Sequence, residues 1–333
     1  MTLASTFQYT NLMKTRGLGR SGLDVGAMGL GCWAIGGSFW DRGGYMGYGD
    51  VDDTESVRAL HRALELGIRF FDVAGVYGCG HAESLLGQVL HETRAEVIIA
   101  AKFGYTFTNT PPEVTGTDIS PTGIRYALEQ SLKRLKREKI DIYQLHLFDL
   151  PLIEALEVAG TLDDLVQEGL IDTYSWCNEL PEALSAFARD TQASVVPILL
   201  NVLEGNRELP ALCADLNLGV MVRRPLGMGL LTGKLQAGHT FADNDMRTRF
   251  KWNFETGKQA KQLQQLRTIK ELLCTDGRTL AQGALAWLWA FHPSLVPIPG
   301  FKTVMQVEEN VAAMNFGALP PAVMLEIQTL MNQ

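Results

Sequence analysis

The sequence lacks the cysteine spacing, the long apolar runs and the leader segment that mark several classes of protein. Its five cysteines, at positions 32, 79, 177, 213 and 274, form no pair with metal-ligand or redox spacing. We therefore expect free thiols in a reducing compartment and no metal site. The longest apolar stretch covers residues 280–291 and is too short for a spanning helix, which needs about 20 residues. The N-terminal segment MTLASTFQYTNLMK has no apolar core of a signal peptide, and we predict a cytoplasmic protein.

Positive charge is also scarce. The chain has a net charge of −8, and its densest basic cluster, KRLKREK at 133–139, lies on an amphipathic segment. Such a cluster is typical of a solvated helix face, and the absence of a basic stripe argues against nucleic acid or an anionic membrane as a partner. An anionic cofactor remains compatible with this charge, because a few local cations can hold one. Few features indicate an obligate interface, so we expect a monomer or a homodimer.

The sequence does contain a regular alternation of short apolar runs and longer amphipathic segments. The strand-like runs cover residues 27–31, 68–71, 97–101, 141–145, 171–176, 194–200, 219–223 and 295–299. The helix-like segments cover residues 53–67, 82–92, 120–136, 151–169, 180–190, 207–217, 262–275, 280–291 and 303–314, with a further one at the C-terminus. This alternation predicts a parallel α/β sheet, and eight such units predict a (β/α)8 TIM barrel with extra C-terminal helices. An open doubly wound sheet is the alternative. No linker interrupts the pattern, so we expect a single domain over residues 1–333.

The segment GLGRSG, at 17–22, matches the glycine pattern of a dinucleotide-binding loop. Such a loop must leave a buried strand and open a helix, whereas the flanking sequences KTR and LDVGAMG are typical of a β-hairpin. We predict an N-terminal β-hairpin that caps the bottom of the barrel. Two long stretches without periodicity, 103–119 and 224–259, follow predicted strands, and loops in that position carry ligand contacts in such barrels.

Polar residues stand where the predicted strands end. In chain order they are Asp72, Lys102, His146, the pair Cys177 and Asn178, Asn201 and Arg223. The carboxyl ends of barrel strands form one mouth, so these groups should converge there. Taken singly, each has a structural explanation, because such residues are usually caps, solvated charges or core members.

Tyr77, five residues after Asp72, indicates a chemical role for this group of polar residues. Tyrosine has a pKa of about 10 and is a poor proton donor at neutral pH until something stabilises its anion. An ammonium group such as that of Lys102 does so, and a carboxylate such as that of Asp72 keeps the ammonium charged. With His146 nearby, such a relay can protonate a developing alkoxide, which is the chemistry of carbonyl reduction.

Six stretches match a known family in order: GLGRSGLDVGAMGLGCW, RFFDVAGVYG, VIIAAKFG, IDIYQLH, PLGMGLLTGK and VPIPGFKTVMQVEEN. Through them the chain resembles the aldo-keto reductase superfamily over nearly its whole length, with Val73 in place of the usual threonine. The resemblance implies a barrel that binds a nicotinamide dinucleotide and a catalytic tetrad of Asp72, Tyr77, Lys102 and His146. It implies that Tyr77, its pKa lowered by Lys102, gives a proton to the carbonyl oxygen, and that His146 orients that carbonyl.

The resemblance also implies cofactor-binding residues, although the nicotinamide end departs from the family pattern. The family holds the carboxamide with a Ser-Asn pair and a glutamine. This chain has Cys177, Asn178 and Pro197 there, so more would rest on Asn178. Arg223 stands where many members stack an aromatic ring, and its planar guanidinium can stack likewise. The implied residues are Asn178, Arg223, Pro225, Leu226, Gly229, Lys234, Gly300, Lys302, Thr303, Gln306, Glu309 and Asn310.

The cofactor implied is NADP(H), favoured over NAD(H). Lys302 and Thr303 are the residues that would bind a 2′-phosphate, and Gln306 replaces the arginine of many NADPH-specific members. A lysine is a point charge and lacks the bidentate fork of arginine, so the preference over NAD(H) rests on few groups.

The substrate pocket is expected to be open and largely apolar. Trp33, Trp40 and Phe103 are its candidate residues, and Tyr45, Tyr48 and Tyr105 are weaker ones. The sequence therefore predicts a reductase or dehydrogenase that acts on a small carbonyl or alcohol substrate. A cofactor-sensing regulatory protein with little turnover, and a lyase or isomerase on the same barrel, are the alternatives.

Overall fold

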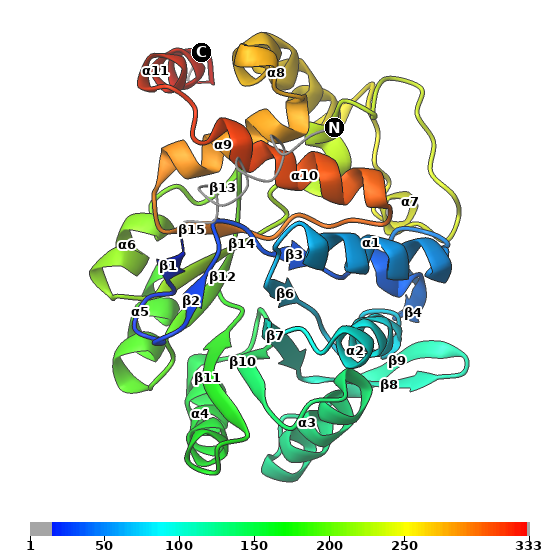
Figure 1. The fold of residues 1–333 in the computed structure, drawn as a ribbon, viewed down its shortest axis with the longest axis vertical. Helices are drawn as coiled ribbons and strands as arrows, with labels where there is room; N and C mark the ends of the chain where they lie inside the picture. The colour runs from blue at the N-terminus through cyan, green and yellow to red at the C-terminus, as the bar shows by residue number, and fades with distance from the viewer. Residues whose placement is uncertain (1–14, 332–333) are drawn as a thin grey trace, which may run out of the picture.

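Parallel strands arranged around a barrel form the centre of the molecule (Figure 1). The computed structural model describes residues 15–331. Within them, eight strands build the barrel: β3 (Leu30–Gly31), β6 (Phe70–Asp72), β7 (Ile98–Phe103), β10 (Ile140–Leu145), β11 (Ile171–Trp176), β12 (Val195–Asn201), β14 (Gly219–Arg223) and β15 (Leu295–Pro297). They pair in the orders β11-β10-β7-β6-β3 and β12-β14-β15, with β13 (Glu204–Gly205) antiparallel to β12.

Backbone hydrogen bonds join these two sheets at both seams. Gly29 and Gly31 donate to the carbonyls of Pro297 and Pro299, each at 3.0 Å, and so connect β3 to the β15 segment. At the other seam the N–H of Ser194 donates to the carbonyl of Tyr174 at 3.3 Å. The (β/α)8 barrel predicted from the sequence is therefore confirmed, and the open doubly wound sheet is wrong.

Helices surround the strands, and side-chain caps begin several of them. Ser120, the N-cap of the helix Pro121–Leu135, accepts from Gly123 N at 3.1 Å. Thr279 and Gln282 form a reciprocal capping box, which satisfies two helix donors. The helices are α1 (Asp53–Glu65), α2 (His81–Thr93), α3 (Pro121–Leu135), α4 (Leu152–Gln167), α5 (Pro181–Asp190), α6 (Leu209–Asp215), α7 (Met246–Arg249), α8 (Gly257–Leu273), α9 (Leu280–Phe291), α10 (Val304–Phe316) and α11 (Pro321–Met331). Between residues 15 and 331, none of them has the length and apolar character to cross a membrane.

The glycine-rich segment near the N-terminus forms the predicted hairpin, with strands β1 (Arg16–Gly17) and β2 (Asp24–Val25). Its residues Leu18 and Val25 are buried against Phe70, Val195 and Val296, at the N-terminal ends of the barrel strands, and others. The hairpin therefore fills the end of the barrel opposite the mouth. The match of GLGRSG to a dinucleotide-binding loop has no structural counterpart.

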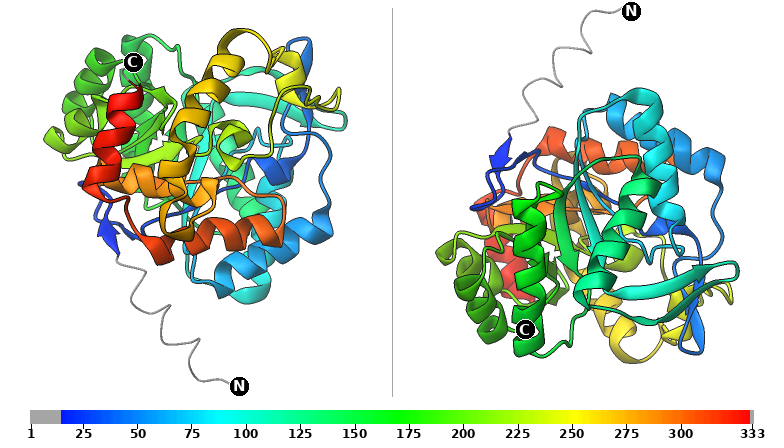
Figure 2. Two further views of the ribbon diagram at one scale, coloured as in Figure 1. Left: turned by 90° about the horizontal axis from the view of Figure 1, so that it is seen from above. Right: turned by 90° about the horizontal axis from the view of Figure 1, so that it is seen from below.

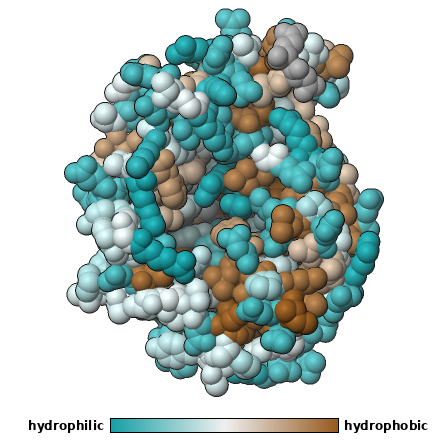
Figure 3. All heavy atoms as spheres, turned by 180° about the vertical axis from the view of Figure 1, so that it is seen from behind, coloured by the Kyte–Doolittle hydropathy of each residue, from teal (hydrophilic) through white to brown (hydrophobic). Residues whose placement is uncertain are grey.

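Four short strands stand above the mouth, and two of them lie in the stretch 103–119, for which the sequence predicted no regular structure. They are β4 (Phe39–Asp41), β5 (Gly44–Met46), β8 (Tyr105–Asn109) and β9 (Pro112–Thr117), paired in the order β5-β4-β9-β8. Two antiparallel hairpins are joined through the pairing of Trp40 with Glu113, and Figure 2 shows them projecting beside the barrel. The stretch 103–119 is thus largely a hairpin, and 224–259 contains the 3-10 segment η3 (Gly227–Thr232) and α7. Figure 3 shows the face that bears these segments, which is hollowed near its middle.

Candidate active site

A buried ion pair joins the ends of two neighbouring strands. Lys102 Nζ lies 2.6 Å from each carboxylate oxygen of Asp72 and donates to Val73 O at 3.1 Å. The side chains of Lys102 and Asp72 are only 5% and 6% exposed. Burial lowers the pKa of Lys102, but the Asp72 carboxylate and further neighbours raise it by more, so the pKa lies above its usual value. The lysine is therefore a fixed positive charge at neutral pH.

Gln144 completes this pair, and sequence reasoning missed it. Its amide Nε2 donates to Asp72 Oδ1 at 3.1 Å, and the residue is fully buried on β10 in register with Lys102. A buried amide that binds a carboxylate satisfies a lone pair that the lysine leaves free. The signal in the sequence was the glutamine inside the apolar run DIYQL, because a buried polar residue needs a partner.

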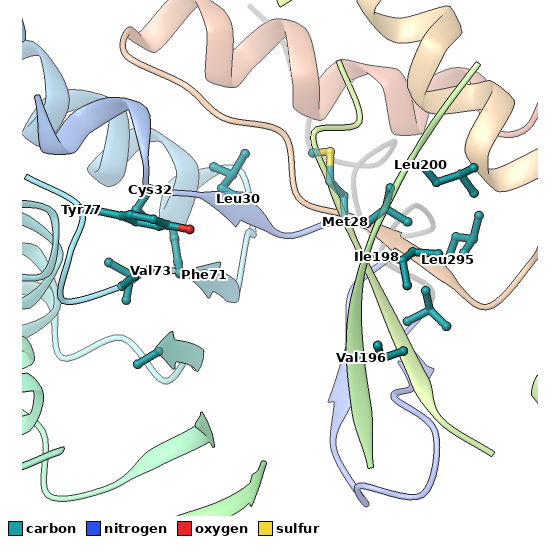
Figure 4. Packing of buried hydrophobic residues seen from close by; sticks show 14 of the residues in the cluster. Met28, Leu30, Cys32, Phe71, Val73, Tyr77, Val196, Ile198, Leu200 and Leu295 are labelled. Carbon is teal, nitrogen blue, oxygen red and sulfur yellow. The ribbon is translucent and has the colours of Figure 1, made fainter. Parts of the chain in front are cut away.

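Tyr77 lies beside Lys102. Lys102 Nζ is 4.8 Å from the centroid of the Tyr77 ring, and the indole of Trp33 stacks on that ring at 5.6 Å with an interplanar angle of 14°. In Figure 4 the hydroxyl of Tyr77 points toward the interior between the strands. The turn that carries Tyr77 needs glycine at the next position: Gly78 has φ +61°, and a Cβ there would lie 1.8 Å from the carbonyl oxygen of Gly36.

The resemblance implied a lowered pKa for Tyr77, and the structure shows the opposite direction. Burial raises the pKa of the phenol, the charge of Lys102 lowers it by less, and the net pKa lies above its ordinary value. The prediction considered the ammonium group but not the loss of water around the ring. Tyr77 is therefore protonated at neutral pH, which is the form that a proton donor requires, and Lys102 favours the anion that remains once the proton has left.

His146 follows β10 and faces the same tyrosine. Its ring lies edge-on to Tyr77, Tyr105 and Phe148, with centroid distances of 6.0, 5.6 and 5.5 Å. Burial, followed by the charges of Lys102 and Arg223, holds the pKa of His146 well below 6.5. Its Nδ1 is buried and has no hydrogen-bond partner among the described residues. Because Nδ1 is buried, a polar atom of a ligand in the cavity would bind the other ring nitrogen, Nε2.

One cavity of about 530 Å³ contains all four side chains. Ten predicted cofactor residues also line it: Arg223, Pro225, Leu226, Gly229, Lys234, Gly300, Lys302, Gln306, Glu309 and Asn310. Asn178 and Thr303 do not. Asn178 Nδ2 donates to Phe148 O and its Oδ1 accepts from Leu180 N, at 3.1 and 2.8 Å. Backbone groups thus use one N–H and one lone pair of the Asn178 amide, and its role toward the carboxamide stays a prediction.

Of the three predicted substrate residues, only Trp33 lines the cavity. Trp40 is 38% exposed and packs edge-on against Tyr45, and Phe103 is buried against Tyr143. Side chains alternate between the two faces of a strand. Because Phe39, Asp41 and Lys102 face the cavity, their strand neighbours Trp40 and Phe103 point away from it.

The lining of the cavity suits an anionic dinucleotide. Among the described residues that line it, six are Lys or Arg and three are Asp or Glu, although the whole chain is negative. Lys302 Nζ donates to the carbonyls of Tyr48 and Asp50 at 2.6 and 2.8 Å, which leaves one N–H for a phosphate. Sequence reasoning did not select Arg224 or Arg247, which line the same cavity, because no motif distinguished them from other surface arginines.

Comparison with known proteins identifies the family. A model of the aldo/keto reductase family matches residues 27–332, so the chain belongs to this family, as its motifs predicted. An aldo-keto reductase of Schizosaccharomyces pombe whose name specifies NADP(+) is 29% identical over 304 residues, which cover 89% of this chain and 84% of that protein. The NADH-specific methylglyoxal reductase of Escherichia coli is 28% identical over 316 residues, which cover 91% of this chain and 94% of that protein. The solved structure of a glycerol dehydrogenase from Gluconobacter oxydans has a TM-score of 0.80 at 28% identity and covers 96% of this chain and 95% of its own.

Proposed function

We propose that this protein is an NADP(H)-dependent oxidoreductase that reduces the carbonyl group of an aldehyde, ketone or sugar, or catalyses the reverse oxidation. The observation that carries the proposal is the buried Asp72–Lys102 pair beside the ring of Tyr77. A charged lysine held at this position favours a phenolate and so assists the departure of the phenol proton. The four tetrad side chains share one cavity with ten of the predicted cofactor residues, so a cofactor and a carbonyl substrate would meet in the same site.

Each side chain of the site has its own role in the proposed carbonyl reduction. When bound, the cofactor supplies a hydride to the carbonyl carbon. Tyr77 donates its proton to the carbonyl oxygen, and Lys102, kept charged by Asp72, stabilises the resulting phenolate. His146, neutral because burial lowers its pKa, hydrogen-bonds the carbonyl oxygen and orients it toward Tyr77. Trp33, stacked on the Tyr77 ring, forms an apolar wall for the substrate.

The preference for NADP(H) rests mainly on the remaining N–H of Lys302, which lines the cavity. Thr303 lies next to it but outside the cavity lining; its hydroxyl accepts from Gln306 N at 3.3 Å and keeps its own hydrogen for donation. These groups would bind the 2′-phosphate. The named relatives include one specified for NADP(+) and one for NADH. The proposal also places the protein in the cytoplasm, as a single domain over residues 1–333 that acts as a monomer or a homodimer.

The test is turnover of 4-nitrobenzaldehyde with NADPH or NADH, followed by absorbance at the nicotinamide band. We expect the wild type to turn over with NADPH at the higher kcat/KM, and Tyr77→Phe to lower kcat by about 10²–10⁴-fold, the range typical of general acid catalysis. Binding of NADPH to Tyr77→Phe should be unchanged. Equal kcat in Tyr77→Phe and wild type would refute the assignment of the donor, and a higher kcat/KM with NADH would refute the cofactor preference.

The alternative function, a cofactor-sensing protein with little turnover, is favoured by one observation. Cys177 and Pro197 line the cavity where the family has a serine and a glutamine, and burial raises the pKa of the Cys177 thiol to about 12, so it remains a weak neutral donor. Tight binding of NADPH without turnover of any aldehyde, ketone or sugar would support this alternative.

A further inference from the structure

A glutamate outside the predicted site bridges the seam between β11 and β12. The two strands form no ladder within residues 15–331, and β12 contains Pro197, which has no N–H to donate. Leu199, two residues further along and therefore at the same edge of the strand, donates its N–H to Glu179 Oε1. Glu179, in the loop after β11, thus supplies the acceptor that a paired strand would otherwise provide.

The same carboxylate oxygen holds a cavity residue. Arg223 Nη2 and Nε donate to Glu179 Oε1 at 2.7 and 3.1 Å, and the guanidinium carbon lies 4.8 Å from the centroid of the Phe148 ring. The side chains of Arg223 and Glu179 are 23% and 26% exposed. The guanidinium is therefore fixed along one edge by Glu179 and over one face by Phe148, and Arg223 and Phe148 both line the cavity.

This pair lies at the reacting end of the cavity. The ring of Phe148 is 5.5 Å from that of His146, and the charge of Arg223 contributes, after burial and Lys102, to the lowered pKa of His146. In the proposed function, on which the present inference rests, the hydride donor must come within about 3–3.5 Å of the carbonyl carbon. The nicotinamide ring must therefore lie next to His146 and Tyr77, where Arg223 is held.

We propose that Glu179 is a positioning residue for the nicotinamide ring. It holds Arg223 so that the guanidinium plane, packed on Phe148, forms a wall of the ring's pocket. Three residues stand where other members of the family hold the nicotinamide carboxamide, and their side chains are poorly placed or poorly suited to hold the ring. The thiol of Cys177 is a weak donor, Asn178 lies outside the cavity lining with its amide bonded to two backbone groups, and the side chain of Pro197 offers no hydrogen bond.

The experiment measures what the nicotinamide ring contributes to binding. Isothermal titration calorimetry gives the Kd of NADPH, whose reduced ring is neutral and electron-rich, and of ADP-ribose 2′-phosphate, the same molecule without the ring, together with NADH and ADP-ribose. Arg223→Lys keeps a positive charge beside Glu179 but lacks the planar face. Glu179→Gln keeps an oxygen for Leu199 but lacks the charge that holds the guanidinium. The control, Glu168→Gln, weakens a matched Arg125–Glu168 pair on the surface, at 2.7 and 2.6 Å.

We expect Arg223→Lys to weaken the dinucleotide about tenfold, the scale of a partly desolvated stacked cation, and Glu179→Gln to weaken it about threefold, because a neutral acceptor holds arginine less firmly. Fragment affinity should stay within error in both variants, and Glu168→Gln should change neither affinity. Unchanged dinucleotide binding in Glu179→Gln would overturn the inference, whatever the result with Arg223→Lys, and leave Glu179 a purely structural role at the seam. Equal weakening of fragment and dinucleotide would overturn it as well, because the whole site would then be distorted.

Two results with the wild type separate this inference from the proposed function. A wild type that binds the dinucleotide no more tightly than the fragment would overturn the inference while cofactor binding stands. A wild type that binds neither NADPH nor NADH would overturn the proposed function itself.

Discussion

Replacing Asp72 by asparagine removes the carboxylate that compensates the buried charge of Lys102. Lys102 Nζ lies 2.6 Å from both Asp72 oxygens, and the two side chains are nearly inaccessible. Removing one partner of a buried ion pair costs about 3–5 kcal/mol, because the other charge stays in the interior without compensation. At about 2.1 cal/mol/K per residue, the unfolding entropy of a chain of 333 residues is about 0.7 kcal/mol/K. The expected fall in Tm is therefore about 4–7 °C at neutral pH.

The fall in Tm caused by Asp72→Asn should become smaller as pH rises. In the wild type the pKa of Lys102 is raised, because Asp72 outweighs burial. Its stabilising contribution is then complete below the unfolded pKa of about 10.4 and is lost as pH rises through the folded pKa. In Asp72→Asn burial acts without the carboxylate and lowers the pKa of Lys102. The folded variant binds fewer protons than the unfolded chain, so its stability rises with pH up to about 10.4.

Differential scanning calorimetry at one scan rate, at pH 6, 7, 8 and 9, measures both effects. The difference in Tm between wild type and Asp72→Asn should be largest at pH 6 and should shrink toward pH 9. The control is Asp172→Asn, which weakens the exposed Lys139–Asp172 pair at 2.7 Å and should cost about 1 kcal/mol or less. A difference that is below about 2 °C at pH 7, or constant across the pH range, would refute the reasoning.

Three further predictions follow from the site. Because burial and neighbouring cations hold the pKa of His146 well below 6.5, log kcat/KM from pH 6 to 8 should show no inflection at the usual histidine value. Gly78→Ala should lower Tm by several degrees more than Gly22→Ala in thermal scans, since both have positive φ but only the first would clash with backbone. Trp33→Ala should raise KM for an aromatic aldehyde at least about threefold, whereas Trp40→Ala, outside the cavity, should leave KM unchanged.

The barrel could be predicted because its signal repeats along the chain. Each strand is buried on both faces and reads as a short apolar run, and each crossover helix has its own period. Asp72, Lys102 and His146 were found at the strand ends for the same reason, since the fold alone brings the carboxyl ends of the strands together. The four-stranded sheet over the mouth was missed because its hairpins are short, and the pairing of Trp40 with Glu113 joins distant segments.

The remaining differences from the predictions arise from features that depend on three dimensions. The faces of Trp40 and Phe103 depend on strand pairing and register, which the sequence around them does not specify. The amide of Asn178 is bound by carbonyl and N–H groups that only the folded loop brings near it. The raised pKa of Tyr77 reflects burial by Trp33 and neighbouring chain segments, whereas the motif indicated only the charge beside it.

The hairpin β1–β2 closes one end of the barrel, so small molecules can enter and leave the site only at the other end. Since Leu18 and Val25 fill the far end of the barrel, a ligand that reaches Tyr77 must come and go on the side of β4, β9 and η3. Two ligands that share one entrance bind in order of depth, and the deeper one arrives first and departs last. A protein built this way would display ordered rather than random kinetics.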